Sequence, residues 1–264
     1  MKPGDPNQWN ETAANWRQTN HQTLLRLISD LLNSRLFENW LPETKVERLL
    51  KTDLFDESLT EGLCPLLSRH ANHVFCMDIS LATVIAAKRK YPQLQAIVAD
   101  VRRLPFAKGT FDIVVSNSTL DHFETPEEIV TSLADMNLVM RNEAELLLTL
   151  DNKNNPVIYL RNVLPYRLLH NLGILPYYVG TTFSVCCLKE VLQKLNFSVL
   201  DTTAFWHFPR ILIVGAAWLI DKFILNKSKE KLLNFILSFE SLSKSPTKYL
   251  TGQFIAAKAI KRAK

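Results

Sequence analysis

Acidic and amide side chains end three apolar segments in the first half of the chain. Residues 73–78 end on Asp78, residues 96–100 end on Asp100, and residues 111–117 end on Ser116 and Asn117. Apolar runs of this length are typical of strands buried on both faces of a parallel sheet. Ligand-binding groups collect at the carboxyl ends of such strands. Two carboxylates there suit the hydroxyl groups of a ribose and an adenine ring, so the pattern predicts a cofactor that contains a nucleoside.

The scarcity of glycine limits which nucleoside cofactor fits. A dinucleotide site needs Gly-x-Gly-x-x-Gly after the first strand, so that the backbone can approach the pyrophosphate. No glycine lies between Gly4 and Gly62, and a Gly-x-x-x-x-Gly-Lys phosphate loop is also absent from the sequence. A cofactor without phosphates therefore fits best, and S-adenosylmethionine is the obvious one.

Strands and helices alternate around these segments. Ser80 is a predicted helix N-cap, and Thr125-Pro126-Glu127-Glu128 is a typical helix start with a capping box. We expect strands over residues 46–53, 73–78, 96–100, 111–116, 144–150, 197–204 and 252–261, and helices over residues 20–40, 57–70, 80–90, 125–140 and 186–195, with 206–245 mostly helical. The alternation predicts an α/β fold with a doubly wound, mostly parallel sheet, flanking helices and a helical insertion before the last strand.

The chain is expected to form one domain. Its predicted parts are an N-terminal helical cap over residues 1–42, a cofactor-binding core over 43–152, an acceptor-side region over 153–250 and a terminal strand over 251–264.

Residues 74–152 resemble the core of the class I S-adenosylmethionine-dependent methyltransferases, of the broad type 11 kind that acts on small molecules. The resemblance rests on the order and spacing of three pieces, residues 74–80, 98–106 and 109–123. It implies a Rossmann-like methyltransferase sheet and S-adenosylmethionine as the cofactor. It also implies roles for six residues: Asp78, next to Ile79, would bind the ribose hydroxyls, Asp100 with Val101 would hold the adenine, and Asn117 and Ser118 would face the methionine end.

The first loop departs from the pattern of that family. The usual acidic residue followed by Gly-x-Gly-x-Gly is replaced by residues 50–62, in which only Gly62 remains. Carboxylates at Asp53, Asp56 or Glu57 can still pair with the ammonium group of the cofactor. The altered loop also leaves a second function open, in which a methyltransferase-fold protein binds a ligand or a partner without catalysis.

Methyl transfer from a sulfonium is an in-line displacement, in which positioning supplies much of the rate. A hydroxyl acceptor would need a base, and His122 is the best candidate because it follows the fourth strand, where an acceptor pocket would open. The other interpretation is that His122 packs the loop or caps the next helix. Asp121, His170 and His207 are expected to be structural. The aromatic residues of the acceptor-side region would line a small-molecule pocket or a plain helical core; they are Tyr159, Tyr166, Tyr177, Tyr178, Trp206 and Phe208.

The net charge of +5 comes from a basic tail after residue 226. A solvated basic face is the favoured interpretation of this tail. Nucleic-acid methylation ranks last, because an Asn/Asp-Pro-Pro-Tyr motif and a catalytic Pro-Cys are absent from the sequence. The apolar segment 211–220 is shorter than the roughly 20 residues that span a bilayer, but together with the tail it permits peripheral membrane contact. No secretory signal is visible and the four cysteines lack metal-ligand spacing, so we expect a cytoplasmic protein without a metal site.

Overall fold

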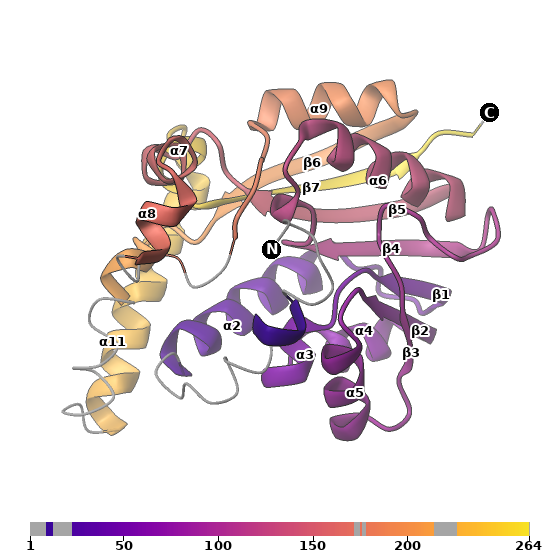
Figure 1. Ribbon diagram of the computed structural model, residues 1–264, viewed down its shortest axis with the longest axis horizontal. Helices are drawn as coiled ribbons and strands as arrows, with labels where there is room; N and C mark the ends of the chain where they lie inside the picture. The colour runs from indigo at the N-terminus through magenta and orange to yellow at the C-terminus, as the bar shows by residue number, and fades with distance from the viewer. Residues whose placement is uncertain (1–8, 13–22, 172–174, 176–177, 214–225, 264) are drawn as a thin grey trace.

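The computed structural model describes residues 9–12, 23–171, 175, 178–213 and 226–263. Within these residues, seven strands form one sheet in the order β3-β2-β1-β4-β5-β7-β6 (Figure 1). β7 is antiparallel to β5 and β6, and the other neighbours are parallel. The predicted fold class is therefore confirmed. The strands are β1 (Val46–Lys51), β2 (Ala71–Asp78), β3 (Gln95–Val98), β4 (Phe111–Asn117), β5 (Met140–Asp151), β6 (Phe197–Phe205) and β7 (Phe254–Lys261).

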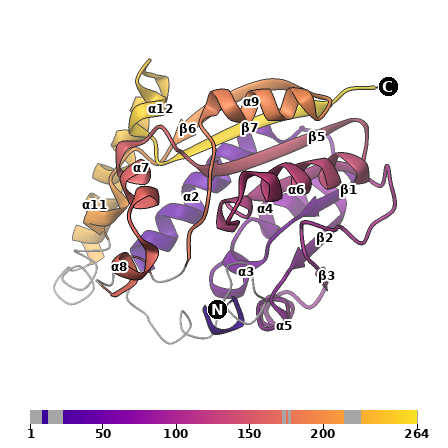
Figure 2. The ribbon, with the colours of Figure 1, turned by 45° about the horizontal axis from the view of Figure 1, so that its top comes forward.

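Helices cover both faces of the sheet (Figures 1 and 2). α6 (Pro126–Val139) and α9 (Val185–Lys194) pack on one face, whereas α2 (Thr23–Trp40), α4 (Cys64–His70) and α11 (Asn226–Ser238) pack on the other. Successive side chains of a strand point to opposite faces, so one strand serves both layers. In β4, Val114 belongs to the first core, and Ile113 and Val115 belong to the second.

The remaining elements lie at the ends of the sheet or flank it. They are α3 (Phe55–Leu59), α5 (Leu81–Lys90), the 3-10 helix η1 (Leu120–His122), α7 (Pro156–Val163), α8 (Tyr166–Asn171), the 3-10 helix η2 (Phe239–Lys244) and α12 (Lys248–Thr251). None of the helices in the described ranges is long and apolar enough to cross a membrane.

Both predicted helix starts are confirmed. The Ser80 side chain accepts a hydrogen bond from the backbone N–H of Thr83 and begins α5. Thr125 and Glu128 form a complete capping box at the start of α6, with Pro126 in its first turn. These caps begin two helices directly after loops that carry predicted site residues.

Several predicted element limits need correction. Residues 57–70 form two helices, α3 and α4, because Gly62 takes a left-handed conformation between them (φ +61°). β3 ends at Val98, so Asp100 lies in the following loop, and β5 is longer than predicted, beginning at Met140. The expected helical insertion contains α11 and η2, but residues 214–225, and with them most of the apolar segment 211–220, lie outside the described residues, as does Tyr177.

Candidate cofactor and acceptor site

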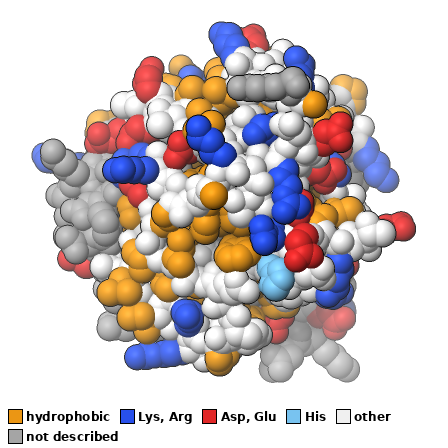
Figure 3. All heavy atoms as spheres, turned by 90° about the vertical axis from the view of Figure 1, so that its right-hand side faces the viewer, with side chains coloured by type: hydrophobic (Ala, Val, Ile, Leu, Met, Phe, Trp, Pro, Cys, Tyr) orange, Lys and Arg blue, Asp and Glu red, His pale blue; other side chains and the backbone are white. Residues whose placement is uncertain are grey.

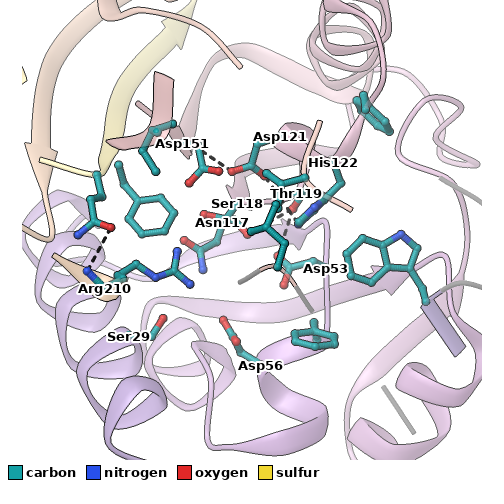
Figure 4. Close-up of a pocket in the computed structure, with 18 of the residues that line it drawn as sticks. Ser29, Asp53, Asp56, Asn117, Ser118, Thr119, Asp121, His122, Asp151 and Arg210 are labelled. Carbon is teal, nitrogen blue, oxygen red and sulfur yellow. Dashed lines mark hydrogen bonds and ion pairs between the residues drawn. The ribbon is translucent and has the colours of Figure 1, made fainter. Parts of the chain in front are cut away.

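A cavity of about 760 Å³ runs along the carboxyl ends of the strands (Figure 4). One polar residue at or just after each of five strands lines it: Asp53, Asp78, Asp100, Asn117 and Asp151. The structure also brings other predicted site residues into this lining, namely Asp56, Ile79, Val101, Ser118 and His122. Residues that are far apart in the sequence thus share one site at the edge where the resemblance expects a cofactor.

Asp78 is a buried carboxylate with remaining capacity to accept hydrogen bonds. Its Oδ2 accepts from the backbone N–H of Leu54 at 2.9 Å, and its Oδ1 accepts from that of Ser80 at 2.8 Å. Each oxygen has a second lone pair. Burial raises the pKa of Asp78 to about 7, against the opposing effect of the two N–H groups. Hydroxyl donors from a ligand would complete its hydrogen bonding and favour the ionised form.

Asp100 is held by an arginine. The Arg102 guanidinium bonds both oxygens of Asp100, with a shortest distance of 2.6 Å, and reaches Glu128 at 2.7 Å. Hydrogen bonds that Arg102 donates to Asp100 raise the pKa of Arg102, and burial partly opposes this rise. This fork fixes the orientation of the Asp100 carboxylate beside Val101 in the cavity wall.

The first loop lacks the expected glycines, and a buried lysine holds it together instead. The ammonium of Lys51 lies 2.9 Å from Asp53 Oδ1 and 3.0 Å from Glu57 Oε2. Burial opposes its ionisation, but the charges of Asp53 and Glu57 outweigh burial and raise the pKa of Lys51. Lys51 also donates to the Asp53 carbonyl at 2.8 Å, so it holds the loop closed from within.

Glu57 and Gly62 support this loop from behind instead of lining the cavity. Oε1 of Glu57 accepts from the backbone N–H groups of Leu63 and Cys64 at the start of α4. A Cβ on Gly62 would lie 2.5 Å from the Glu57 carboxyl carbon. Gly62 therefore provides both the left-handed turn and the room that the Glu57 carboxylate occupies.

Asp53 and Asp56 are the two carboxylates of the loop that line the cavity. Burial raises the pKa of each to about 6; for Asp53 the Lys51 charge opposes this rise, and for Asp56 the Glu57 charge adds to it. Arg26 on α2 lies 3.7 Å from Asp56. The pair of carboxylates provides acceptors suited to an ammonium group.

Beyond β4 the chain turns sharply into the cavity. Oδ1 of Asn117 accepts from the Thr149 hydroxyl at 2.8 Å, which fixes its amide. Ser118 adopts a left-handed backbone (φ +49°) and donates its N–H to Thr149 Oγ1 at 2.9 Å. This unusual conformation for a non-glycine residue is held by β5 and re-aims the chain toward η1.

His122, at the end of η1, lines the cavity beside a buried carboxylate. Its Nδ1 lies 3.3 Å from the carbonyl oxygen of Tyr178, and its Nε2 lies 3.8 Å from Oδ1 of Asp121. Asp121 is 2% exposed, and its Oδ2 accepts the backbone N–H of Asp151. Its Oδ1 has no hydrogen-bond partner among the described residues. Burial and the nearby Asp151 raise the pKa of Asp121.

His170 and His207, the two other histidines considered for the acceptor side, make contacts of a structural kind. His207 is buried, with Nδ1 2.8 Å from Thr251 Oγ1 and Nε2 3.2 Å from the Ala204 carbonyl. His170 lies against Tyr166 on α8, with ring centroids 5.3 Å apart. Of the five described aromatic residues proposed for the acceptor side, Trp206 is the one found in the cavity lining, and Phe208 packs against Phe235 and Phe239.

Several lining residues were missed by the sequence analysis. They are Trp9, three polar residues of α2 (Arg26, Ser29 and Asn33), Arg161 on α7 and Arg210 after β6. Trp9 contacts His122 edge to face, with centroids 4.7 Å apart. No local pattern marks these residues, because long-range packing alone brings them to the strand ends. In the described ranges, no group of three or more His, Cys, Asp or Glu is placed to hold a metal ion.

Comparisons with known proteins agree with this geometry. Residues 58–145 match the family model described as "Methyltransferase domain". No curated protein matches the chain by sequence. Among solved structures, an S-adenosylmethionine-dependent methyltransferase from Mesorhizobium loti aligns with a TM-score of 0.58 and 13% identity, over 86% of this chain and 96% of that one.

Two further structures show the same fold at low identity. A Galdieria sulphuraria protein described as a sarcosine dimethylglycine methyltransferase aligns with a TM-score of 0.57 and 9% identity, over 90% of this chain and 86% of that one. Phosphoethanolamine N-methyltransferase 2 from Haemonchus contortus, solved with phosphomonomethylethanolamine and S-adenosylhomocysteine, aligns with a TM-score of 0.51 and 14% identity, over 88% of this chain and 52% of that one.

The carboxylates that line the cavity suit a cofactor without phosphates. The strand ends on the β1–β3 side present carboxylates, which accept from hydroxyl, amino and ammonium groups and repel phosphates. With the family match and the sheet order, these observations define the class: the chain contains a class I S-adenosylmethionine-dependent methyltransferase domain. The cofactor of this domain is S-adenosylmethionine.

Proposed function

We propose that the protein transfers a methyl group from S-adenosylmethionine to a small-molecule acceptor. The observation that carries the proposal is the shared cavity: it joins the carboxylates after β2 and β3 to a histidine–carboxylate pair after β4. Asp78 with Ile79 would hold the ribose and Asp100 with Val101 the adenine. Asp53 and Asp56 would pair with the ammonium group, and Asn117 and Ser118 would face the methionine end.

When bound, the cofactor would supply a methyl carbon for in-line attack by the acceptor, with S-adenosylhomocysteine as the leaving group. The protein's part is to position the acceptor and to remove its proton. The Tyr178 carbonyl orients the His122 ring through Nδ1. Nε2 then takes the proton of an acceptor hydroxyl, and the Asp121 carboxylate 3.8 Å away stabilises the imidazolium that forms.

Methyl transfer from labelled S-adenosylmethionine into the low-molecular-weight fraction of an extract of the source organism tests the proposal. We expect incorporation that needs the native protein and that excess S-adenosylhomocysteine suppresses. The alternative, a methyltransferase fold that binds a ligand or partner without catalysis, predicts no incorporation in any fraction, whether or not S-adenosylhomocysteine binds. The buried Lys51 in place of a glycine loop is the observation that keeps this alternative in view.

Small molecules suit this site better than nucleic acid. The cavity is concave, and its lining combines apolar side chains with carboxylates and other polar groups that converge from several strand ends. On the face drawn in Figure 3, Lys and Arg side chains are interspersed with Asp and Glu. A steep salt dependence of RNA binding would contradict this choice.

We also propose that this cytoplasmic enzyme contacts membrane surfaces through the segment that begins at residue 211. Ile211 and Leu212 are 51% and 58% exposed, and Lys227, Lys229 and Lys231 follow in the sequence. Sedimentation with anionic vesicles tests this contact. Leu212→Asp should weaken it, and equal sedimentation of this variant and the wild type would contradict it.

A further inference from the structure

Arg210 differs from the other arginines of the cavity because no carboxylate of the described residues forms an ion pair with it. Arg102 pairs with Asp100 at 2.6 Å, and Arg161 pairs with Asp151 at 2.7 Å. Arg26 lies 3.7 Å from Asp56. Arg210 has no carboxylate oxygen within 4.0 Å among the described residues, although it is half-buried and lines the cavity.

Aromatic rings hold the Arg210 guanidinium in place. Its Cζ lies 5.1 Å from the centroid of the Trp206 ring and 5.2 Å from that of Phe254. Cation–π contacts of this kind position a guanidinium while its N–H groups can still donate to a ligand. In Figure 4 the Arg210 side chain extends into the cavity on the side of Asn117.

The backbone beneath this arginine is strained and firmly braced. Trp206 adopts a left-handed conformation (φ +60°), which is unfavourable for a bulky residue. The Glu240 carboxylate accepts the backbone N–H groups of Trp206 and His207 at 3.1 and 2.8 Å. Gln253 donates to the Trp206 carbonyl and accepts the backbone N–H of Arg210 at 3.4 Å. Strain that is held this way is typical of functional positions.

Sheet order places Arg210 away from the residues assigned to the nucleoside. Asp78 ends β2, and Arg210 follows β6, which lies five strands along in the order β2-β1-β4-β5-β7-β6. At a spacing of about 4.8 Å per strand, the two strand ends are roughly 24 Å apart. The end of β4, which η1 and His122 follow, lies between these two strand ends. Arg210 therefore belongs to the acceptor end of the cavity.

Apart from the paired Arg161 and Asp151 and the amide of Gln253, the described lining at that end is largely apolar. It comes from α7, α8 and the segment after β6, and includes Ile158, Leu160, Leu164, Leu169 and Ile211. A cation without a partner in such surroundings is costly, and a ligand anion would both neutralise it and form charge-assisted hydrogen bonds.

We infer that the acceptor is an amphiphilic anion, with a carboxylate or phosphate group bound by Arg210 and an apolar body against α7 and α8. That this anion is the methyl acceptor rests on the proposed function, but its binding can be measured without turnover.

Calorimetric titration with four probes of equal chain length tests the site: octanoate, octyl phosphate, octanol and octylammonium, each added to the protein with S-adenosylhomocysteine present. We expect an anion to bind at least about tenfold more tightly than octanol and octylammonium, as suits a charge-assisted contact. The tighter of octanoate and octyl phosphate identifies the anionic group.

Two variants assign the preference to Arg210. Arg210→Gln should abolish the anion preference and leave the affinity for S-adenosylhomocysteine unchanged. Arg167→Gln, which removes the same charge from an exposed position on α8, should keep the preference. Arg210→Lys should retain part of it, and this variant tests the charge if the glutamine variant does not fold.

Three results would overturn the inference: equal binding of all four probes to the wild type, an anion preference that persists in Arg210→Gln, or a parallel loss of S-adenosylhomocysteine affinity in that variant. The last would assign Arg210 to the cofactor carboxylate. Failure of the wild type to bind S-adenosylhomocysteine would instead contradict the proposed function, and the four probes would still report on Arg210.

Discussion

The ammonium of Lys51 lies 3.0 Å from Oε2 of Glu57, and neither side chain is exposed to solvent. This ion pair lies in the loop that stands in place of the expected glycine-rich motif, and it ties the end of β1 to α3. Because Glu57 also accepts two backbone N–H groups of α4, the pair links the cofactor loop to the core.

Breaking this pair should destabilise the whole protein. Lys51→Met leaves the Glu57 carboxylate buried without its counter-ion, and we expect a loss of about 3–5 kcal/mol in the free energy of unfolding. In the double variant Lys51→Met/Glu57→Gln no buried charge remains at the pair, so part of that loss should be recovered. Urea denaturation measures both. A single variant within about 1 kcal/mol of the wild type would show that the pair is not a structural link.

Gly62 offers a test of the same loop through its backbone. Gly62→Ala puts a methyl group 2.5 Å from the Glu57 carboxyl carbon at a positive φ, so it should cost clearly more than the left-handed conformation alone, which is about 1–2 kcal/mol. Gly109→Ala is the matched control, because Gly109 has φ +65° but nothing within 4 Å of its Cβ position. Equal losses of unfolding free energy in the two variants would show that the Glu57 contact does not matter.

Cofactor affinity should depend on pH through Asp78. Its pKa is about 7 in the folded protein, raised by burial from 3.8, so the native state holds this proton to higher pH than the unfolded chain does. Between these two values its contribution to folding stability falls as the pH rises. Ribose hydroxyls donate to the ionised form, so binding of S-adenosylhomocysteine should instead strengthen as the pH rises through 7.

Calorimetry between pH 5.5 and 8.5 would follow this transition. In Asp78→Asn the midpoint should move down toward the pKa of about 6 that Asp53 and Asp56 share. An unchanged midpoint in that variant would assign the transition to another group.

His122 should matter for turnover and not for cofactor binding. For a hydroxyl acceptor, His122→Asn should lower kcat about 10²–10⁴-fold, the usual contribution of a general base. Affinity for S-adenosylhomocysteine should stay within about twofold, because His122 is assigned to the acceptor and not to the cofactor. A variant with normal turnover would leave His122 as a packing partner of Trp9.

Local sequence signals predicted the framework of this site. Apolar runs that end in Asp78 and Asn117, and the caps at Ser80 and Thr125, depend on neighbours within a few residues, so they can be read from one sequence. Asp100 was also predicted. The bridge from Asp100 through Arg102 to Glu128 was not, because Glu128 lies on α6, 26 residues after Arg102 in the sequence.

The acceptor end could not be predicted in the same way. Arg210 and Trp206 reach the cavity because β6 and β7 return along the sheet, and Arg26 reaches it because α2 packs beneath the strand ends. The sequence of the first loop likewise predicted three candidate carboxylates, but it did not show which of them line the cavity. Glu57 forms a buried ion pair with Lys51 and so lies in the core, whereas Asp53 and Asp56 line the cavity.

Titration of S-adenosylhomocysteine into the wild type, Asp78→Asn and Asp112→Asn tests the central claim most directly. Asp112 also accepts a backbone N–H, from Arg48, but lies near the amino end of β4, so Asp112→Asn is a matched control. One site per chain is predicted, with affinity about tenfold or more weaker in Asp78→Asn and unchanged in Asp112→Asn. An absence of binding by the wild type at millimolar ligand would contradict the account.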